Sequence, residues 1–226
     1  MEKTYRLKVA GLERELPICP LNKKMSIAAF IMFSDVELTV ACAKELLTRV
    51  PDFDVIVTAE SKGIPLAYEM ARQSGKNYYP ARKAKKLYMS DPVAVEVKSI
   101  TTANRQTLYL DRHDMDALAE KRVLIVDDVI STGESLNALK ELVRQSRGKI
   151  AACAAVLAEG SAAERGDILF LSPLPLFFSL ISVSASVPLP PVCSGRKGFS
   201  FGIFRACAAK IERALPAAAA KTACPL

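Results

Sequence analysis

One apolar run that ends in two acids constrains the fold of this chain more than any other feature. Residues 123–130 read Val-Leu-Ile-Val-Asp-Asp-Val-Ile, and Ser-Thr-Gly-Glu-Ser follows at 131–135. A run this apolar predicts a strand that is buried on both faces, as in a parallel sheet. Because a dry core does not hold unpaired carboxylates, we expect Asp127 and Asp128 to emerge at the carboxyl end of that strand.

The turn after this strand predicts an anion site. Leu136, Leu139 and Val143 recur at helical spacing, so a helix is expected to begin where the loop closes. Small hydroxyl residues and a glycine at a helix N-terminus present free backbone N–H groups and the positive end of the helix dipole, which suit phosphate. Two acids beside such a cradle suit a ligand with hydroxyls or a metal next to a phosphate, such as a ribose 5-phosphate. The spacings of the Walker loop and of the dinucleotide fingerprint are both absent.

The whole stretch from 123 to 135 resembles the phosphoribosyl pyrophosphate signature of type I phosphoribosyltransferases, and the resemblance covers residues 12–177. It implies an α/β fold with a mostly parallel sheet flanked by helices, a small N-terminal hood at about residues 1–33 and a flexible β-hairpin loop. It also implies that Asp127 and Asp128 are catalytic residues, which hold the ribose hydroxyls and favour a cationic sugar centre. The residues implied for the 5′-phosphate are Ser131, Thr132, Gly133, Glu134 and Ser135, with Glu134 standing where many members have glycine.

A second tight turn, between a strand at 54–59 and a helix at 64–73, has the same strand–turn–helix order, so its backbone N–H groups predict a second anion site. In the family this place is the pyrophosphate loop, which implies that Glu60, Ser61, Lys62 and Gly63 bind pyrophosphate. Adenine phosphoribosyltransferases typically carry Asp-Ser-Arg-Gly there, and Lys62 keeps the charge of that arginine without its bidentate fork. The resemblance also predicts a cis or strained peptide bond between Glu60 and Ser61.

A basic segment follows the next strand, at 78–81, and resembles the family's Arg-Lys-x-x-Lys-Leu sequence. It implies that Arg82, Lys83 and Lys86 bind pyrophosphate. Segments 93–97 and 106–110 alternate like a β-hairpin, whose Glu96 matches the catalytic glutamate of the family's closing loop. Residues 34–37 predict a capping box with Ser34 as N-cap, ahead of a helix from Val36.

The remaining pattern completes an alternation of strands and helices. A helix is expected to about residue 146 and a strand at 150–157, which favours a parallel sheet with ligands at the carboxyl ends of its strands. His113 lies in a charged connection and is expected to be exposed rather than catalytic.

Composition limits the class of protein. The 226 residues, half of them hydrophobic, suffice for one α/β domain. The charged N-terminus lacks the apolar region of a secretory signal, and the six cysteines include no C-x-x-C pair, so we expect reduced thiols in a cytoplasm and no zinc site. Most of the net charge of +7 lies beyond residue 177, where six Lys or Arg residues face one Glu. A nearly neutral body argues against a nucleic-acid partner.

The chain is therefore expected to divide into a phosphoribosyltransferase domain at 1–177 and a low-complexity, disordered extension at 178–226. The stretch from 168 to 195 has no charge, but its prolines interrupt it too often for a membrane-spanning helix. We expect that truncation after Phe177 leaves the protein active.

The resemblance implies transfer of a phosphoribosyl group from phosphoribosyl pyrophosphate to a purine base, with adenine favoured, in cytoplasmic purine salvage. It implies Mg²⁺ as the cofactor, bound through phosphoribosyl pyrophosphate, and a homodimer. Two alternatives stay open: transfer to xanthine or another purine, and a non-catalytic regulator that binds phosphoribosyl pyrophosphate. Such regulators add an N-terminal DNA-binding domain, for which the roughly thirty residues before the first core helix are too few.

Overall fold

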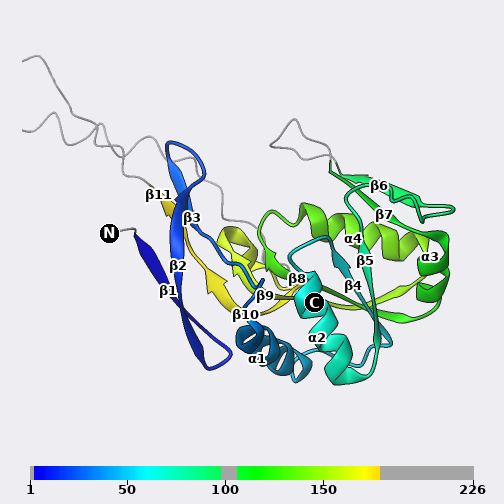
Figure 1. Cartoon of the computed structure of the whole chain (residues 1–226), viewed down its shortest axis with the longest axis horizontal. Coiled ribbons are helices and arrows are strands. Elements are labelled where there is room, and N and C mark those ends of the chain that lie inside the picture. The colour runs from blue at the N-terminus through cyan, green and yellow to red at the C-terminus, as the bar shows by residue number, and fades with distance from the viewer. Residues whose placement is uncertain (1–2, 98–105, 179–226) are drawn as a thin grey trace, which may run out of the picture. The chain divides into compact units, whose positions relative to one another are not determined.

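The structure is a computed structural model that describes residues 3–97 and 106–178 (Figure 1). The expected loop tip and the expected extension, except Phe178, lie outside the described residues. In chain order the elements are β1 (Thr4–Val9), β2 (Leu12–Pro20), β3 (Met25–Ala28), α1 (Val36–Leu47), β4 (Val55–Ala59), α2 (Ile64–Ser74), β5 (Asn77–Ala81), β6 (Val93–Val97), β7 (Gln106–Leu110), α3 (Arg112–Leu118), β8 (Arg122–Ile130), α4 (Glu134–Gln145), β9 (Lys149–Glu159), the 3₁₀ helix η1 (Gly160–Glu164), β10 (Leu169–Leu174) and β11 (Leu176–Phe178).

A five-stranded sheet in the order β10-β9-β8-β4-β5 forms the centre, and every neighbouring pair in it is parallel. The expected α/β fold with a parallel sheet is confirmed. The strand order changes direction between β4 and β8, the first and third strands of this sheet along the chain. In sheets of this topology a crevice opens outside the carboxyl ends of the strands at that switch point, so the loops after β4 and β8 are brought together.

Strand β8 is central because its apolar run faces a core on each side. Val123 and Ile125 pack with α3, α4 and the β6–β7 hairpin, whereas Leu124 and Val126 pack with α1 and α2. All four are at most 1% exposed. Figure 1 shows α1 and α2 on one side of the sheet and α4 on the other. At about 1.5–3 kcal/mol for each buried aliphatic side chain, this strand anchors both layers.

The two acids lie inside β8 rather than beyond its end, which corrects the expectation that they emerge there. The ladder to β4 stops at Thr58↔Val126, but the ladder to β9 continues through Asp127↔Ala155 to Ile130↔Ala158. Strand β8 therefore continues beyond both acids through its backbone pairing with β9. On the other side the pairing with β4 has ended, so the two acids lie where β8 is paired on one side only.

Helix α1 starts at Val36 as expected, but the prediction of Ser34 as its N-cap residue is wrong. Asp35 is the N-cap, and its Oδ1 accepts a hydrogen bond from the Leu38 N–H at 3.1 Å. Ser34 instead takes a positive φ of 68°. The shift by one residue follows from Asp35, which is as good an N-cap as serine and also binds a cation from β2.

The β-hairpin and the exposure of His113 are as expected. The charged segment around His113, however, forms a helix. Strands β6 and β7 pair in antiparallel register from Val93↔Leu110 to Val97↔Gln106. The His113 side chain is 88% exposed, but it lies on the short helix α3. The buried residues of this helix are Met115 and Leu118, which lie on its inner face.

An antiparallel sheet in the order β1-β2-β3-β11 forms the N-terminal hood, which we call the hood sheet. Its last strand comes from the end of the described chain, with Leu176 paired to Ile27 and Phe178 paired to Met25. The ring of Phe177 packs edge-on against Tyr5 at a centroid distance of 5.8 Å. Phe178 thus belongs to a strand, one residue past the boundary expected at 177.

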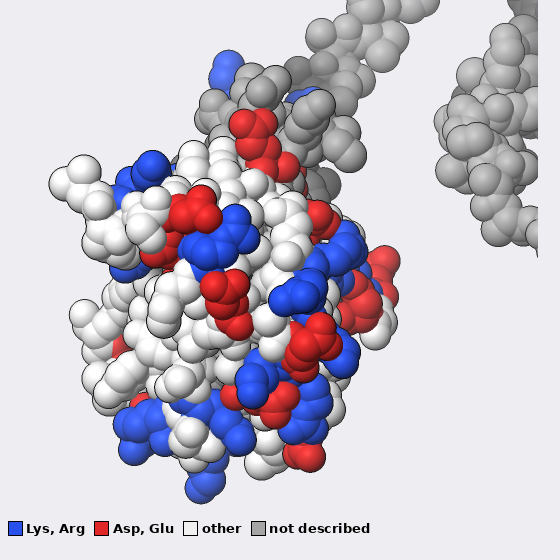
Figure 2. Space-filling view, turned by 90° about the vertical axis from the view of Figure 1, so that its right-hand side faces the viewer, with Lys and Arg blue, Asp and Glu red and all other residues white. Residues whose placement is uncertain are grey.

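Lys and Arg residues are interspersed with Asp and Glu on the face shown in Figure 2, so this face is no single-sign surface. Within residues 3–97 and 106–178, no helix has both the length and the apolar character that a membrane crossing requires.

Candidate active site

The loop after β4 (residues 60–63, the β4 loop) and the loop after β8 (residues 131–135, the β8 loop) meet at the switch point. Gly63 shows how close the β4 loop approaches: a Cβ atom placed on it would lie 2.3 Å from Thr58 Oγ1 and 2.9 Å from Asp127 Oδ1. Only glycine leaves room for this contact. The β4 loop is therefore pressed directly against the first of the two acids.

Asp127 and Asp128 are two adjacent carboxyl groups in a largely buried environment. Asp128 is 4% exposed, and its backbone N–H donates to Asp127 Oδ1 at 2.9 Å. Burial and the adjacent Asp128 hold the pKa of Asp127 well above its usual value. Burial also raises the pKa of Asp128, against a lowering effect of Lys62. In the described part of the chain Asp128 Oδ2 is buried with no hydrogen-bond partner. A buried, unpartnered carboxylate oxygen in a crevice is the kind of group that a ligand satisfies.

The β8 loop forms a small anion-sized recess. Together with Asp127 it lines a cavity of about 50 Å³. Gly133 takes a φ of 80°, which glycine adopts without strain, and its carbonyl accepts the Asn137 N–H at the start of α4. The structure thus places all five residues expected for the 5′-phosphate at the N-terminus of α4, which begins at Glu134. The first N–H groups of a helix have no acceptor within the helix, and here the Glu134 N–H lies 3.5 Å from Thr132 Oγ1.

The β4 loop gathers the expected cations around Glu60. Its carboxylate accepts the Lys83 backbone N–H at 3.0 Å and lies 3.4 Å from Arg82 Nη1 and 3.7 Å from Lys86 Nζ. The Lys83 N–H and these cations lower the pKa of Glu60. The Glu60–Ser61 peptide bond is cis, as expected. The Glu60 carboxylate thus contacts Arg82 and Lys86 of the basic segment through its charge, independently of the conformation of that peptide bond.

A second cavity, of about 260 Å³, lies where the hood sheet meets the switch point. Its wall includes Ile27 to Ile31 of the hood and Leu174, and its polar groups include Lys62, Asp128 and Glu159. Burial raises the pKa of Glu159, which ends β9. Sequence reasoning missed Glu159, although a polar residue at the carboxyl end of a buried strand was the signal that found Asp127 and Asp128.

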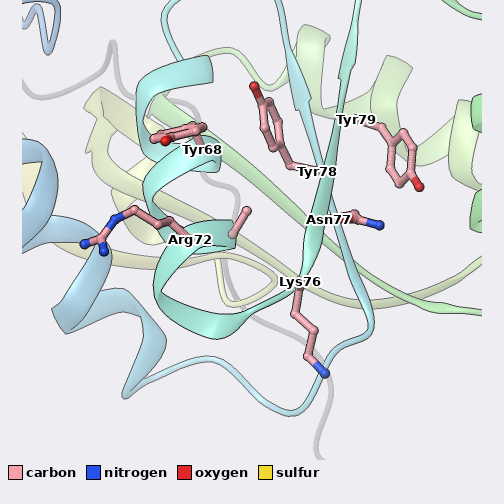
Figure 3. Close-up of a pocket in the computed structure, with 7 residues that line it drawn as sticks. Tyr68, Arg72, Lys76, Asn77, Tyr78 and Tyr79 are labelled. Atoms are coloured by element: carbon pink, nitrogen blue, oxygen red, sulfur yellow. The ribbon is translucent and has the colours of Figure 1, made fainter.

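A larger hollow, of about 470 Å³, lies apart from these loops, at the α2 and β5 edge of the sheet (Figure 3). Tyr68 of α2 and Tyr78 of β5 pack edge-on in it, with ring centroids 6.2 Å apart. It reaches Lys76 and Asn77 at the amino end of β5. Ligands of such sheets bind at carboxyl ends, so this hollow is not the candidate site.

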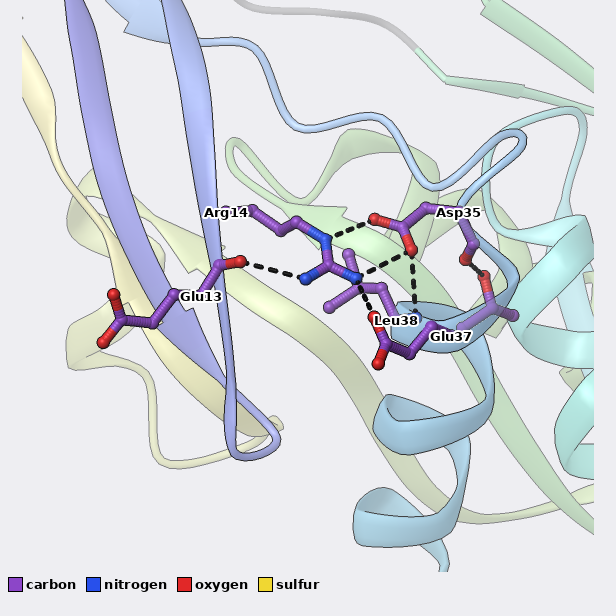
Figure 4. Close-up of polar contacts among 6 residues, drawn as sticks. Glu13, Arg14, Asp35, Glu37 and Leu38 are labelled. Carbon is purple, nitrogen blue, oxygen red and sulfur yellow. Dashed lines mark hydrogen bonds and ion pairs between the residues drawn. The ribbon is translucent and has the colours of Figure 1, made fainter.

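An ion-pair cluster fixes the hood sheet to the core, as Figure 4 shows. Arg14 of β2 donates to Asp35 Oδ2 at 2.7 Å and to Asp35 Oδ1 at 3.0 Å, and to Glu37 Oε2 at 2.7 Å. Arg14 and Asp35 are only about a quarter exposed, whereas Glu37 is 70% exposed. Arg14 lowers the pKa of Asp35. The cluster thus ties strand β2 of the hood sheet to the start of α1.

We expect Asp35→Ala to lower the free energy of unfolding by about 1–2 kcal/mol, since it removes an N-cap and the partner of Arg14. Glu37→Gln, the matched control, should stay within about 0.5 kcal/mol of wild type because that carboxylate is exposed. Urea titrations measure both. The Asp35 contribution is present above the unfolded pKa and should vanish as the pH falls through the lowered folded pKa. Equal losses in the two variants would contradict this ranking.

Glu96 and Arg165 lie on elements outside the two loops. Glu96 is exposed on β6, opposite Thr107. Arg165, which sequence reasoning missed, follows η1 and places Nη1 2.3 Å from the position that a Cβ on Gly133 would occupy. No local pattern marks Arg165, because this contact arises only from tertiary packing. Within the described residues, no cluster of three or more His, Cys, Asp or Glu side chains is arranged to hold a metal.

Comparisons with known proteins agree with this geometry. Residues 43–174 match the model of the phosphoribosyl transferase domain. The adenine phosphoribosyltransferase of Saccharopolyspora erythraea is 33% identical over 154 residues, which cover 66% of this chain and 78% of that protein. That of Petrotoga mobilis is 37% identical over 100 residues, and the matched part spans about half of that protein, 54%.

Two solved structures share the fold. The adenine phosphoribosyltransferase of Rhodothermus marinus has a TM-score of 0.52 at 24% identity, over 62% of this chain and 79% of that one. The Giardia lamblia enzyme, solved with 9-deazaadenine, has a TM-score of 0.51 at 20% identity, over 63% of this chain and 82% of that one. At these identities the likeness shows a common fold.

Proposed function

Because this chain belongs to the phosphoribosyl transferase domain family, we propose that it transfers a phosphoribosyl group from phosphoribosyl pyrophosphate to adenine, which gives a nucleoside monophosphate and pyrophosphate. The proposal places the protein in purine salvage. One observation supports it beyond family membership: the Asp128 side chain, whose Oδ2 is buried without a partner among the described residues, lines a cavity together with Lys62 of the β4 loop and Ser131 of the β8 loop. That arrangement suits a sugar whose hydroxyls face the acids and whose two phosphate groups lie on either side.

The roles proposed for the residues follow from their charges. Asp127 and Asp128 accept the ribose hydroxyls and stabilise the cationic sugar carbon that forms as pyrophosphate leaves. The β8 loop binds the 5′-phosphate through its backbone N–H groups. Lys62, Arg82, Lys83 and Lys86 neutralise the pyrophosphate, with Ser61 and Gly63 contributing backbone and Glu60 holding the cations in place. Glu96 closes over the reacting centre.

The base is proposed to lie in the 260 Å³ cavity beneath the hood sheet. Its apolar wall, which includes Phe30 and Leu174, suits a flat purine ring, and Lys62 and Asp128 lie on the side that would face the ribose. In this proposal the hood residues that line the cavity shield the activated sugar from hydrolysis.

Mg²⁺ is the proposed cofactor. Carboxylate oxygens are ligands that it prefers, and Asp128 Oδ2 would hold either this cation or a sugar hydroxyl. The described residues provide no three-ligand cluster, so the remaining ligands would come from phosphoribosyl pyrophosphate. When bound, Mg²⁺ supplies positive charge to the leaving pyrophosphate.

We further propose a cytoplasmic homodimer. Cys42 and Cys153 are buried free thiols, which suits a reducing compartment. Several apolar side chains are exposed on α1, on α2 and just before α1, among them Phe33 at 46%, Val36 at 72% and Tyr68 at 54%, which suits a contact with a second copy. Light scattering in solution measures the mass, and a monomer at micromolar concentration would contradict the dimer.

A panel of purine bases tests the activity. With phosphoribosyl pyrophosphate and Mg²⁺, we expect pyrophosphate release with adenine and much slower release with hypoxanthine, guanine or xanthine. A preference for xanthine or another purine would replace the proposed substrate and keep the chemistry. Binding of phosphoribosyl pyrophosphate without turnover on any base would contradict an enzyme and favour a regulator.

A further inference from the structure

Arg165 reaches the β8 loop from another part of the sheet. It follows η1, in the connection between β9 and β10, and its Nη1 atom lies where a side chain at position 133 would otherwise be, 2.3 Å from that Cβ position. The glycine at 133 is therefore needed for its φ of 80° and also for the approach of this guanidinium.

The guanidinium is held in one orientation. Nε donates to Asp167 Oδ1 and Nη2 donates to Asp167 Oδ2, each at 2.8 Å, which is the bidentate geometry of an arginine–carboxylate pair. Lys140 of α4 donates to the same Asp167 Oδ2 at 2.7 Å. The cluster of two cations and one anion thus ties the β9–β10 connection to α4 and keeps a net positive charge.

One edge of Arg165 stays available. Asp167 takes Nε and Nη2, and no described residue provides a hydrogen-bond acceptor for Nη1, the atom that lies against Gly133. The side chain is 28% exposed. A pre-oriented guanidinium loses little rotamer freedom when an anion binds, so such an edge is an effective phosphate donor.

The charge of the β8 loop shows why a cation is needed there. Residues 131–135 contain no Lys or Arg, and they include Glu134. Asp127 lines the same 50 Å³ cavity. The Arg82 and Lys86 cations of the basic segment pair with Glu60 instead, and Lys62 lines the 260 Å³ cavity with Asp128. A phosphate dianion in the β8 loop would therefore meet backbone N–H groups and carboxylates, with Arg165 as the cation beside Gly133.

We propose that Arg165 is a further phosphate-binding residue of this site, which donates Nη1 to the phosphate monoester that the β8 loop holds. The identity of that monoester as phosphoribosyl pyrophosphate rests on the proposed function. Asp167 and Lys140 are positioning residues that orient the guanidinium.

Binding of ribose 5-phosphate and of pyrophosphate to the full chain, measured by calorimetry, tests this assignment without requiring turnover. Arg165→Gln should raise the Kd for ribose 5-phosphate about tenfold, which corresponds to about 1.4 kcal/mol, and should leave the Kd for pyrophosphate within about twofold. Arg144→Gln is the matched control, because Arg144 is 73% exposed in the last turn of α4, far from the β8 loop, and pairs with Glu141. It should change neither Kd.

An unchanged Kd for ribose 5-phosphate in Arg165→Gln would overturn the proposal, and so would equal weakening of both ligands or the absence of ribose 5-phosphate binding in wild type. If Arg165→Gln does not fold, Arg165→Lys is measured in its place. Weaker binding of ribose 5-phosphate alone supports the proposal, and equal changes in the Kd values for ribose 5-phosphate and pyrophosphate overturn it. A wild-type protein that binds ribose 5-phosphate but turns over no base would refute the proposed function alone.

Discussion

Replacing both Asp127 and Asp128 with asparagine should lower turnover by a factor of about 10²–10³ or more and leave the fold intact. The loss is expected because asparagine keeps the shape of the two side chains but removes the negative charge that would stabilise a cationic sugar carbon. Single-turnover assays with saturating phosphoribosyl pyrophosphate and base measure the chemical step. Unchanged turnover would show that the acids have no catalytic role.

The same variant should be at least as stable as wild type at neutral pH. Burial raises the folded-state pKa of both carboxyls, so their ionisation opposes folding, and wild-type stability is lost as the pH rises through those raised values. Asparagine does not ionise, so the advantage of the variant should grow from acidic to neutral pH. Thermal unfolding across that range measures it. A variant that unfolds at neutral pH would mean that the acids serve the fold instead.

Gly63→Ala should destabilise the protein by about 1–3 kcal/mol and abolish most of its turnover. The added methyl group would lie 2.3 Å from Thr58 Oγ1 and 2.9 Å from Asp127 Oδ1, so the β4 loop must move away from the acids. The peptide groups of that loop and Asp127 would both lose their positions. Urea titration and steady-state kinetics measure the two losses.

A second change at Thr58 separates packing from catalysis. Its hydroxyl is buried without a partner among the described residues, so Thr58→Ala removes the closest contact at little polar cost. Thr58→Ala combined with Gly63→Ala should recover most of the stability but little of the turnover, because the contact with Asp127 remains. Full recovery of both would show that the contact with Asp127 is unimportant.

The parallel core could be predicted from the sequence because its signals are local. The run from Val123 to Val126 is apolar at every position, as a strand buried on both faces requires, and the structure buries all of it. The hairpin was equally readable, since alternation in 93–97 and 106–110 matches its paired register. The residues of the β4 and β8 loops follow such strands directly, so the sheet brings them to one edge.

The remainder depends on contacts between distant segments. Asp35 replaces Ser34 as the N-cap in a contact that also involves Arg14, twenty-one positions earlier. Helix α3 looks like a charged connection because only Met115 and Leu118 face inward. Arg165 carries no signal at all until β10 pairs with β9 and brings its guanidinium to Gly133. Local patterns therefore identified the loops but not the groups that reach them from elsewhere.

The pairing of β11 with β3 has a consequence for biosynthesis. Ribosomes deliver the chain from its N-terminus at about 5–20 residues per second, so β1, β2 and β3 emerge well before their partner β11. Until Leu176 to Phe178 arrive, β3 is an edge strand with unpaired backbone groups. The nascent hood is thus exposed to chaperones and proteases while the parallel core is already folding. A chain released before residue 176 would carry that open edge permanently and should be degraded faster than the finished domain.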